Sequence, residues 1–135
     1  MEKRKPILLL WIQGWYFLLP SVWPLVHMPS FLAVTGPKTD LWLVRTVALL
    51  LISISLTLLT AAYRKEYLPA LGVLAVTSAA GVAAIDLYYA LNDRIWDTYL
   101  IDAAGEGLLI LAWLVYFLKA GGHRAQAAAT QAVVD

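Results

Sequence analysis

Four long apolar segments alternate with short polar breaks along this chain. An α-helix rises about 1.5 Å per residue, so about 20 apolar residues cross a hydrocarbon layer about 30 Å thick. Each segment has that length, and the first break contains the turn formers Pro29, Gly36 and Pro37. The pattern predicts an all-α integral membrane four-helix bundle. Its expected helices cover residues 7–26, 41–62, 68–91 and 95–118.

We expect a single transmembrane domain over residues 1–120 and an Ala-rich tail over residues 121–135. The first helix follows a basic segment, Lys3 to Lys5, of the kind that also begins secretory signals. Its apolar run is longer than the core of a signal peptide, so we expect an uncleaved helix. Gly121 and Gly122 are expected to end the fourth helix and to leave the tail frayed or loosely helical.

One face of the third expected helix carries small residues. Ala75, Ala79 and Ala83 recur every fourth residue. Small side chains let helices approach closely, and van der Waals contact is a main source of helix association in lipid. The spacing therefore predicts that this face packs against another helix.

Composition agrees with a membrane environment and excludes several classes of protein. Hydrophobic residues make up 61% of the chain and charged residues 14%, a balance that polar surface on a soluble domain of this size does not cover. Disordered chains and nucleic-acid binders are excluded. With no cysteine there is no disulfide or thiolate site. Because phosphate-loop, zinc-protease and nucleophile-elbow motifs are absent, we expect no cofactor and no metal.

The distribution of basic residues predicts the orientation. Cytoplasmic loops of membrane proteins carry an excess of Lys and Arg. One side of the four spans holds only Lys38 and Arg94, with Arg45 just inside the membrane. Both termini are therefore expected in the cytoplasm, and the membrane is expected to be the bacterial inner membrane. The basic residues of the other side are Lys3, Arg4, Lys5, Arg64, Lys65, Lys119 and Arg124.

Four ionisable residues lie inside the expected spans, where an unpaired charge is costly. From the outer end of each span, Arg45 lies about 6 Å deep, Asp86 about 7 to 8 Å, Asp102 about 10 Å and Glu106 about 16 Å. We expect an acidic pocket open to the outer side, with Glu106 at its floor. Arg45 is expected to be the counter-ion of Asp86 or Asp102.

One arginine does not neutralise three carboxylates, so the surplus needs protons, water or a cationic ligand. Asp102 and Glu106 share one helix face, and one of them is expected to carry a proton near neutral pH. Tyr89 lies on the face of Asp86, and His27 is placed at the pocket mouth. Two structural alternatives remain open: an ion pair between Asp102 and Arg45 that sets helix register, and a less favoured all-oxygen metal site.

The segments FLAVTGPKTDLWLVRTVALLL, IDLYYAL and YLIDAAGEGLLIL resemble small uncharacterised four-span proteins of bacteria. In architecture the chain is similar to EXPERA-type membrane proteins, whose intramembrane carboxylates receive a cationic amine or a carbocation. That resemblance implies such a part for Asp86, Asp102 and Glu106. The chain is also similar to DoxX-like proteins, which are accessory subunits. Small multidrug transporters need a carboxylate in the first helix, where this chain has Gln13.

Three functions follow as hypotheses. The favoured one is a membrane protein whose acidic pocket binds a small cationic or lipophilic ligand or relays protons. The second is a membrane-embedded acid-base enzyme, isomerase-like, acting on a lipid-like substrate with Glu106 and Asp102 as catalytic groups. The third is an accessory or assembly subunit. Membrane lipids are expected partners, nucleic acid is not, and a homodimer or larger membrane complex is an open alternative.

Overall fold

The computed structural model describes residues 5–134, and all regular structure in that range is helical. Four long helices, α1, α3, α4 and α5, are each long and apolar enough to cross a membrane, which confirms the prediction of an all-helical protein with four helices of membrane-spanning length. Lys3, Arg4 and Asp135 lie outside the described residues. The helices are α1 (Ile7–Val26), α2 (Met28–Thr35), α3 (Leu41–Tyr63), α4 (Pro69–Leu91) and α5 (Thr98–Val134).

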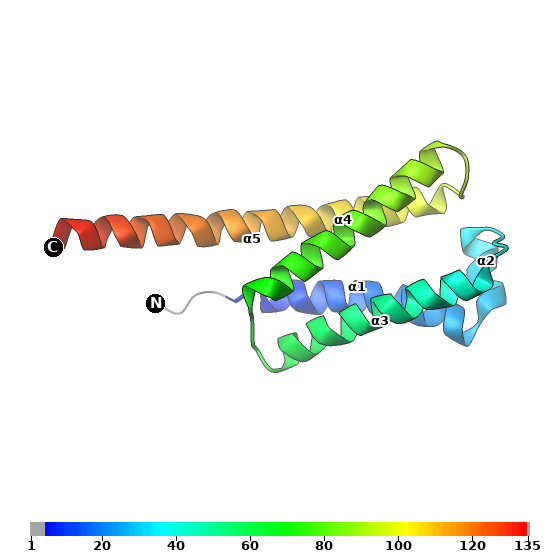
Figure 1. Cartoon of the computed structure of the whole chain (residues 1–135), viewed down its shortest axis with the longest axis horizontal. Helices are drawn as coiled ribbons and strands as arrows, with labels where there is room; N and C mark the ends of the chain where they lie inside the picture. The colour runs from blue at the N-terminus through cyan, green and yellow to red at the C-terminus, as the bar shows by residue number, and fades with distance from the viewer. Residues whose placement is uncertain (1–4, 135) are drawn as a thin grey trace.

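The long helices form two antiparallel pairs, α1 with α3 and α4 with α5 (Figure 1). Fewer contacts join one pair to the other. A buried apolar cluster connects them near the end of the molecule where α1 begins, and it includes Leu10 of α1, Leu58 of α3, Ala75 of α4 and Trp113 of α5. The core therefore lies toward one end, and the pairs meet elsewhere through individual side chains.

Small residues allow the close approach of the helices. Gly72, Ala75, Ala79 and Ala83 are all buried on one face of α4, as the spacing predicts. A Cβ added at Gly72 would lie 2.8 Å from Cζ of Phe117 on α5. The small-residue face of α4 is therefore part of the interface with α5.

A short helix, α2, occupies the segment in which we expected only a turn-rich linker. Pro29 lies in its first turn, where proline's fixed φ and missing N–H favour a helix start. The ring of His27 caps this helix by accepting the N–H of Ser30 at Nδ1, 3.2 Å away. Gly36 ends it with φ 92°. The sequence pattern predicts Pro29 as a turn former between two helices, whereas its position in this segment makes it part of a helix start.

Helix α5 also departs from the expected boundaries. It begins at Thr98, and it continues through Gly121 and Gly122 to Val134, so the prediction that the two glycines end the helix is wrong. Each glycine costs about 1 kcal/mol relative to alanine, and the alanines that follow are the strongest helix formers. With 37 residues α5 is about 55 Å long. Its C-terminal part extends beyond the other helices (Figure 1).

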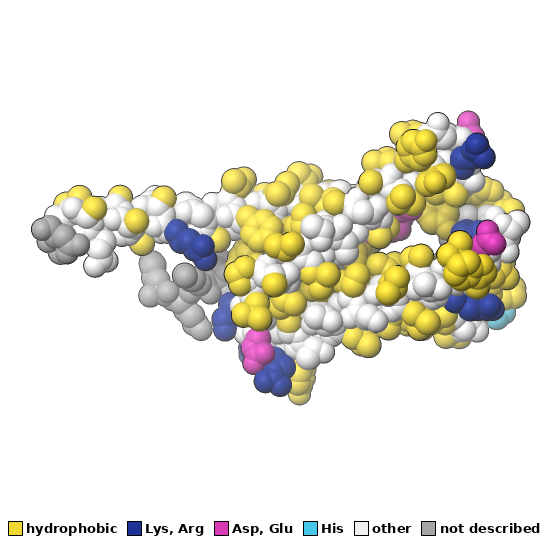
Figure 2. Space-filling model, viewed as in Figure 1, with side chains coloured by type: hydrophobic (Ala, Val, Ile, Leu, Met, Phe, Trp, Pro, Cys, Tyr) yellow, Lys and Arg dark blue, Asp and Glu magenta, His cyan; other side chains and the backbone are white. Residues whose placement is uncertain are grey.

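The surface is that of a protein surrounded by lipid. Figure 2 shows hydrophobic side chains over much of the visible surface of the helices, with Lys and Arg mainly toward their ends. Leu50, Val73, Ile101 and Leu108 are among the large apolar side chains that are more than half exposed. Apolar exposure along four helices is unusual for a soluble monomer, whereas lipid covers it without cost.

Candidate functional site

A cluster of carboxyl groups lies where α4 and α5 face each other. Asp86 is on the buried small-residue face of α4, and its exposed fraction is 6%. Glu106 of α5 is only 2% exposed, and Asp102, one helical turn away, is half-buried. The three groups are close enough for their charges to act on one another. We call Asp86, Asp102 and Glu106 the carboxyl cluster.

Tyr16 joins this cluster from the other helix pair. Its hydroxyl donates to Oδ1 of Asp102 at 2.6 Å and lies 3.1 Å from the Asp102 carbonyl oxygen. Gly105 makes this approach feasible, because a Cβ there would collide with the Tyr16 hydroxyl. Tyr16 is therefore a direct link from α1 to α5.

Two buried oxygen atoms of the cluster have no hydrogen-bond partner among residues 5–134: Oδ2 of Asp86 and Oε2 of Glu106. An unpaired carboxylate away from water costs several kcal/mol. Among the described residues, the only ion pair with a nitrogen–oxygen distance within 4 Å is that of Arg64 with Glu66. None of the three cluster acids is therefore paired with a Lys or Arg in that range. Protonation removes this charge cost without any partner.

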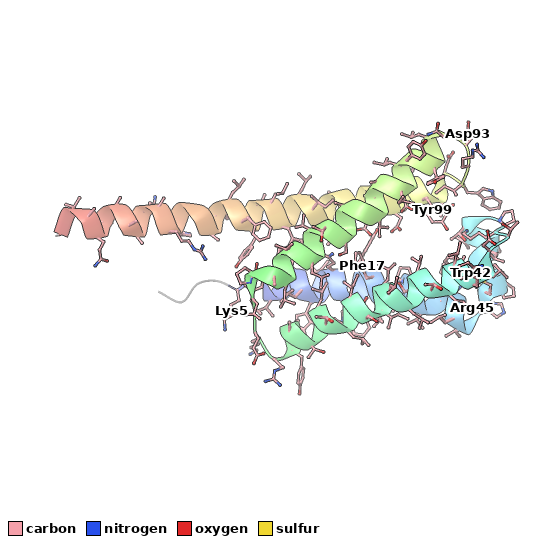
Figure 3. All side chains as sticks on the ribbon, viewed as in Figure 1. Lys5, Phe17, Trp42, Arg45, Asp93 and Tyr99 are labelled. Atoms are coloured by element: carbon pink, nitrogen blue, oxygen red, sulfur yellow. The ribbon has the colours of Figure 1, made fainter. Side chains whose placement is uncertain are left out.

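Arg45 is not brought to the cluster. Its side chain is exposed on α3, beside Trp42 (Figure 3), and it forms no ion pair with the described residues. The expected pair with Asp86 or Asp102 is therefore not formed. The reason is topological: α3 packs on α1, while the cluster belongs to α4 and α5. Arg45 is therefore not close to Asp86 or Asp102, although the three residues were expected at similar depths in the membrane.

His27 and Tyr89 have other surroundings. His27 is exposed, and its ring serves as the cap of α2, with Nδ1 2.7 Å from Oγ of Ser30. Tyr89 is 41% exposed, and its ring stands edge to face with that of Tyr88 at 5.2 Å. Neither makes a hydrogen bond to the carboxyl cluster within the described part of the chain.

A second polar link lies about one turn from Tyr16 along α1. The fully buried carboxamide of Gln13 donates through Nε2 to the carbonyl oxygen of Ala75 at 2.8 Å. Its Oε1 accepts the indole N–H of Trp113 at 2.7 Å. Gln13 thereby connects α1 to both α4 and α5, and both ends of its amide group are satisfied. We call this the Gln13 node.

Sequence reasoning did not select Tyr16 or Gln13 as site residues. A usable signal was present, because these two residues are three apart on an apolar helix and so share one face. Polar groups in a membrane span usually face the protein interior. Applied to uncharged side chains as well as ionised ones, that rule points to this face of α1.

The loops at the end of the molecule opposite the apolar core border an open hollow of about 580 Å³. It is lined by residues 35–38 and 93–98, not by the carboxyl cluster. Lys38 binds Oγ1 of Thr35 at 2.9 Å, and its ammonium lies 5.1 Å from the ring centre of Tyr99. Thr98 donates to the carbonyl oxygen of Val34 at 3.1 Å. The α2 segment is thereby docked on the start of α5.

The donor geometry bears on what the cluster can bind. Among the described residues, no three His, Asp or Glu side chains are grouped as ligands of one metal ion. The acids are neighbours without a common centre. Carboxyl groups arranged in this way are better suited to exchanging single protons than to coordinating a cation.

Fold and site together define a class: an all-helical protein with four helices able to span a membrane and a carboxyl cluster between them. No family model, no curated protein and no solved structure matches this chain.

Proposed function

We propose that this chain is an integral membrane protein whose carboxyl cluster takes up and releases protons within the membrane. The observation that carries the proposal is the pair of unpartnered, buried oxygen atoms on Asp86 and Glu106. A proton neutralises each carboxylate, and so removes the cost of its buried charge, without further space or a counter-charge. Asp102, half-buried and bonded to Tyr16, is the member through which exchange with water is easiest.

The other ligands expected from the sequence have less support. A lipophilic or organic cationic ligand needs a cavity at the acids, and the hollow of about 580 Å³ is lined by loop residues instead. A metal cation needs converging oxygen atoms, which the described carboxyl groups do not supply. The proton is the one candidate ligand that the packed cluster accommodates as it stands.

Infrared difference spectroscopy of the purified protein in lipid tests this function. We expect a protonated carboxyl band at pH 7 that is lost in Glu106→Gln, while the variant keeps its fold because an amide mimics a neutral acid. Glu66→Gln is the matched control, because Glu66 is an exposed glutamate in the α3–α4 turn. A wild-type spectrum without a Glu106 band above about pH 5, where a free glutamate has lost its proton, would refute the proposal.

We further propose that both termini are cytoplasmic in a bacterial inner membrane. Lys5, Arg64 and Lys65 lie at helix ends on one side, Lys119 and Arg124 lie in the part of α5 toward that side, and Lys38 and Arg94 belong to the loops on the other. The asymmetry supports this orientation through the preference of basic residues for the cytoplasm.

Reporter fusions test the orientation. A reporter after Asp135 is expected to be active only in its cytoplasmic form, and one inserted within residues 30–38 only in its exported form. Three spans, α3, α4 and α5, separate the two positions in the proposed topology, so the same sidedness at both positions would contradict it. Replacing Arg64 and Lys65 with Gln is expected to weaken the asymmetry, because they are the basic residues of the α3–α4 turn.

A further inference from the structure

A groove of about 400 Å³ lies between the end of α3 and the beginning of α4, away from the carboxyl cluster. Consecutive helices in a bundle usually pack on each other, but α3 packs on α1 and α4 on α5, and few contacts join α3 to α4. Leu56 and Leu71 form apolar walls of the groove, Thr57 and Thr60 add hydroxyl groups, and Arg64 and Glu66 stand at one end.

The turn after α3 fixes the charged end of the groove. Lys65 adopts the left-handed conformation with φ 54°. The N–H of Lys65 donates to Ala62 O at 3.1 Å, and that of Glu66 donates to Ala61 O at 2.9 Å. These bonds close the end of the helix. They also place the Arg64 guanidinium beside the Glu66 carboxylate, with Nε to Oε2 and Nη2 to Oε1 both at 3.2 Å.

The groove runs from the hydrocarbon layer to the headgroup region. Leu56 and Arg64 are eight residues apart on a helix, which is about 12 Å along its axis. Tyr63 and Tyr67 flank the turn, and tyrosines gather at the membrane interface. The apolar walls therefore lie at acyl-chain depth and the ion pair at headgroup depth. In a bilayer, lipid fills such a groove.

The ion pair remains open to a ligand of matching charge. The side chains of Arg64 and Glu66 are 63% and 62% exposed, so each has free hydrogen-bonding capacity. An exposed ion pair contributes about 0 to 1 kcal/mol to stability, so a bound group rearranges it at little cost. A positive and a negative charge side by side match a zwitterion, whose phosphate suits the guanidinium fork and whose ammonium suits the carboxylate.

We propose that this groove is a binding site for a phospholipid with a primary-amine zwitterionic headgroup. Its phosphate binds Arg64, its ammonium donates to Glu66, and one acyl chain lies along Leu56 and Leu71. A choline headgroup has no N–H to donate, and a glycerol headgroup brings no cation to Glu66. The site is independent of proton exchange at the carboxyl cluster.

Native mass spectrometry of the full chain, equilibrated with equal amounts of phosphatidylethanolamine, phosphatidylcholine and phosphatidylglycerol in detergent, tests the proposal. Wild type is expected to retain phosphatidylethanolamine about tenfold over phosphatidylcholine, the equivalent of one charge-assisted hydrogen bond. Glu66→Gln is expected to abolish this preference. Arg64→Gln is expected to lower retention of all three lipids, because each carries a phosphate.

Lys65→Gln is the matched control, since this exposed basic residue lies between the two and does not line the groove. It is expected to behave as wild type. Equal retention of the three lipids by wild type, preference for phosphatidylglycerol, or an equal loss in Lys65→Gln and Glu66→Gln would each overturn the proposal. The three substitutions lie on an exposed turn, so the variants are expected to fold. Circular dichroism checks this.

Discussion

Gln13→Ala is expected to destabilise the detergent-solubilised protein by about 2 to 4 kcal/mol. The substitution removes both hydrogen bonds of the Gln13 node, to Ala75 O and from Trp113 Nε1. It leaves the indole N–H without a partner at a position where Trp113 is 0% exposed, and it leaves a cavity between the two helix pairs. Reversible unfolding followed by circular dichroism measures the loss.

A double-mutant cycle assigns the effect to the node. Trp113→Phe removes the donor, so the cost of Gln13→Ala is expected to be smaller in that background than in wild type. Gln126→Ala is the control, because Gln126 lies on the exposed part of α5. Additive costs at positions 13 and 113, or a change below about 0.5 kcal/mol in Gln13→Ala, would show that the node does not hold the pairs together.

Gly105→Ala is expected to destabilise the protein by about 1 to 3 kcal/mol, although alanine is the better helix former. The added methyl group would collide with the Tyr16 hydroxyl. Tyr16 therefore has to leave its position, and its bond to Asp102 is lost. The measurement is the same unfolding experiment, with the tyrosine near-ultraviolet signal as a second readout.

The next glycine of the same helix provides the control. A Cβ at Gly107 meets nothing within 4 Å, so Gly107→Ala is expected to stabilise the protein slightly through helix propensity. Combining Gly105→Ala with Tyr16→Ala is expected to recover part of the loss, because the steric conflict disappears. Equal behaviour of the two glycine variants would contradict the close approach of Tyr16 to α5.

The spans were predictable because they depend on local properties. Runs of about 20 apolar residues and the polar breaks between them correspond to α1, α3, α4 and α5. The recurrence of Ala75, Ala79 and Ala83 likewise predicted a buried face of α4. Helix ends were less predictable: Pro29 lies in the first turn of α2, and α5 continues through Gly121 and Gly122. Proline and glycine act differently at different positions in a turn, and neighbouring residues decide which effect prevails.

The candidate site was predictable in part. Burial of Asp86 and Glu106 follows from the cost of charge in lipid, and that principle selected both residues. Their partners depended on which helices pack together. Depth alone favoured Arg45 as counter-ion, yet α3 packs on α1 and Arg45 is exposed. Tyr16 of α1 reaches Asp102 of α5 because Gly105 leaves room. The spacing of residues along one helix does not predict such a contact between two helices.

The sequence by itself thus determined the environment, the number of long helices and the residues that are costly to expose to lipid, because these follow from composition and from one-dimensional spacing. Only the tertiary structure decided the pairing of α1 with α3 and of α4 with α5, the Gln13 node, and the groove beside Arg64 and Glu66. Those features come from contacts between residues far apart in the chain. In lipid such contacts depend on shape and on single hydrogen bonds, since apolar surface is covered equally well by acyl chains.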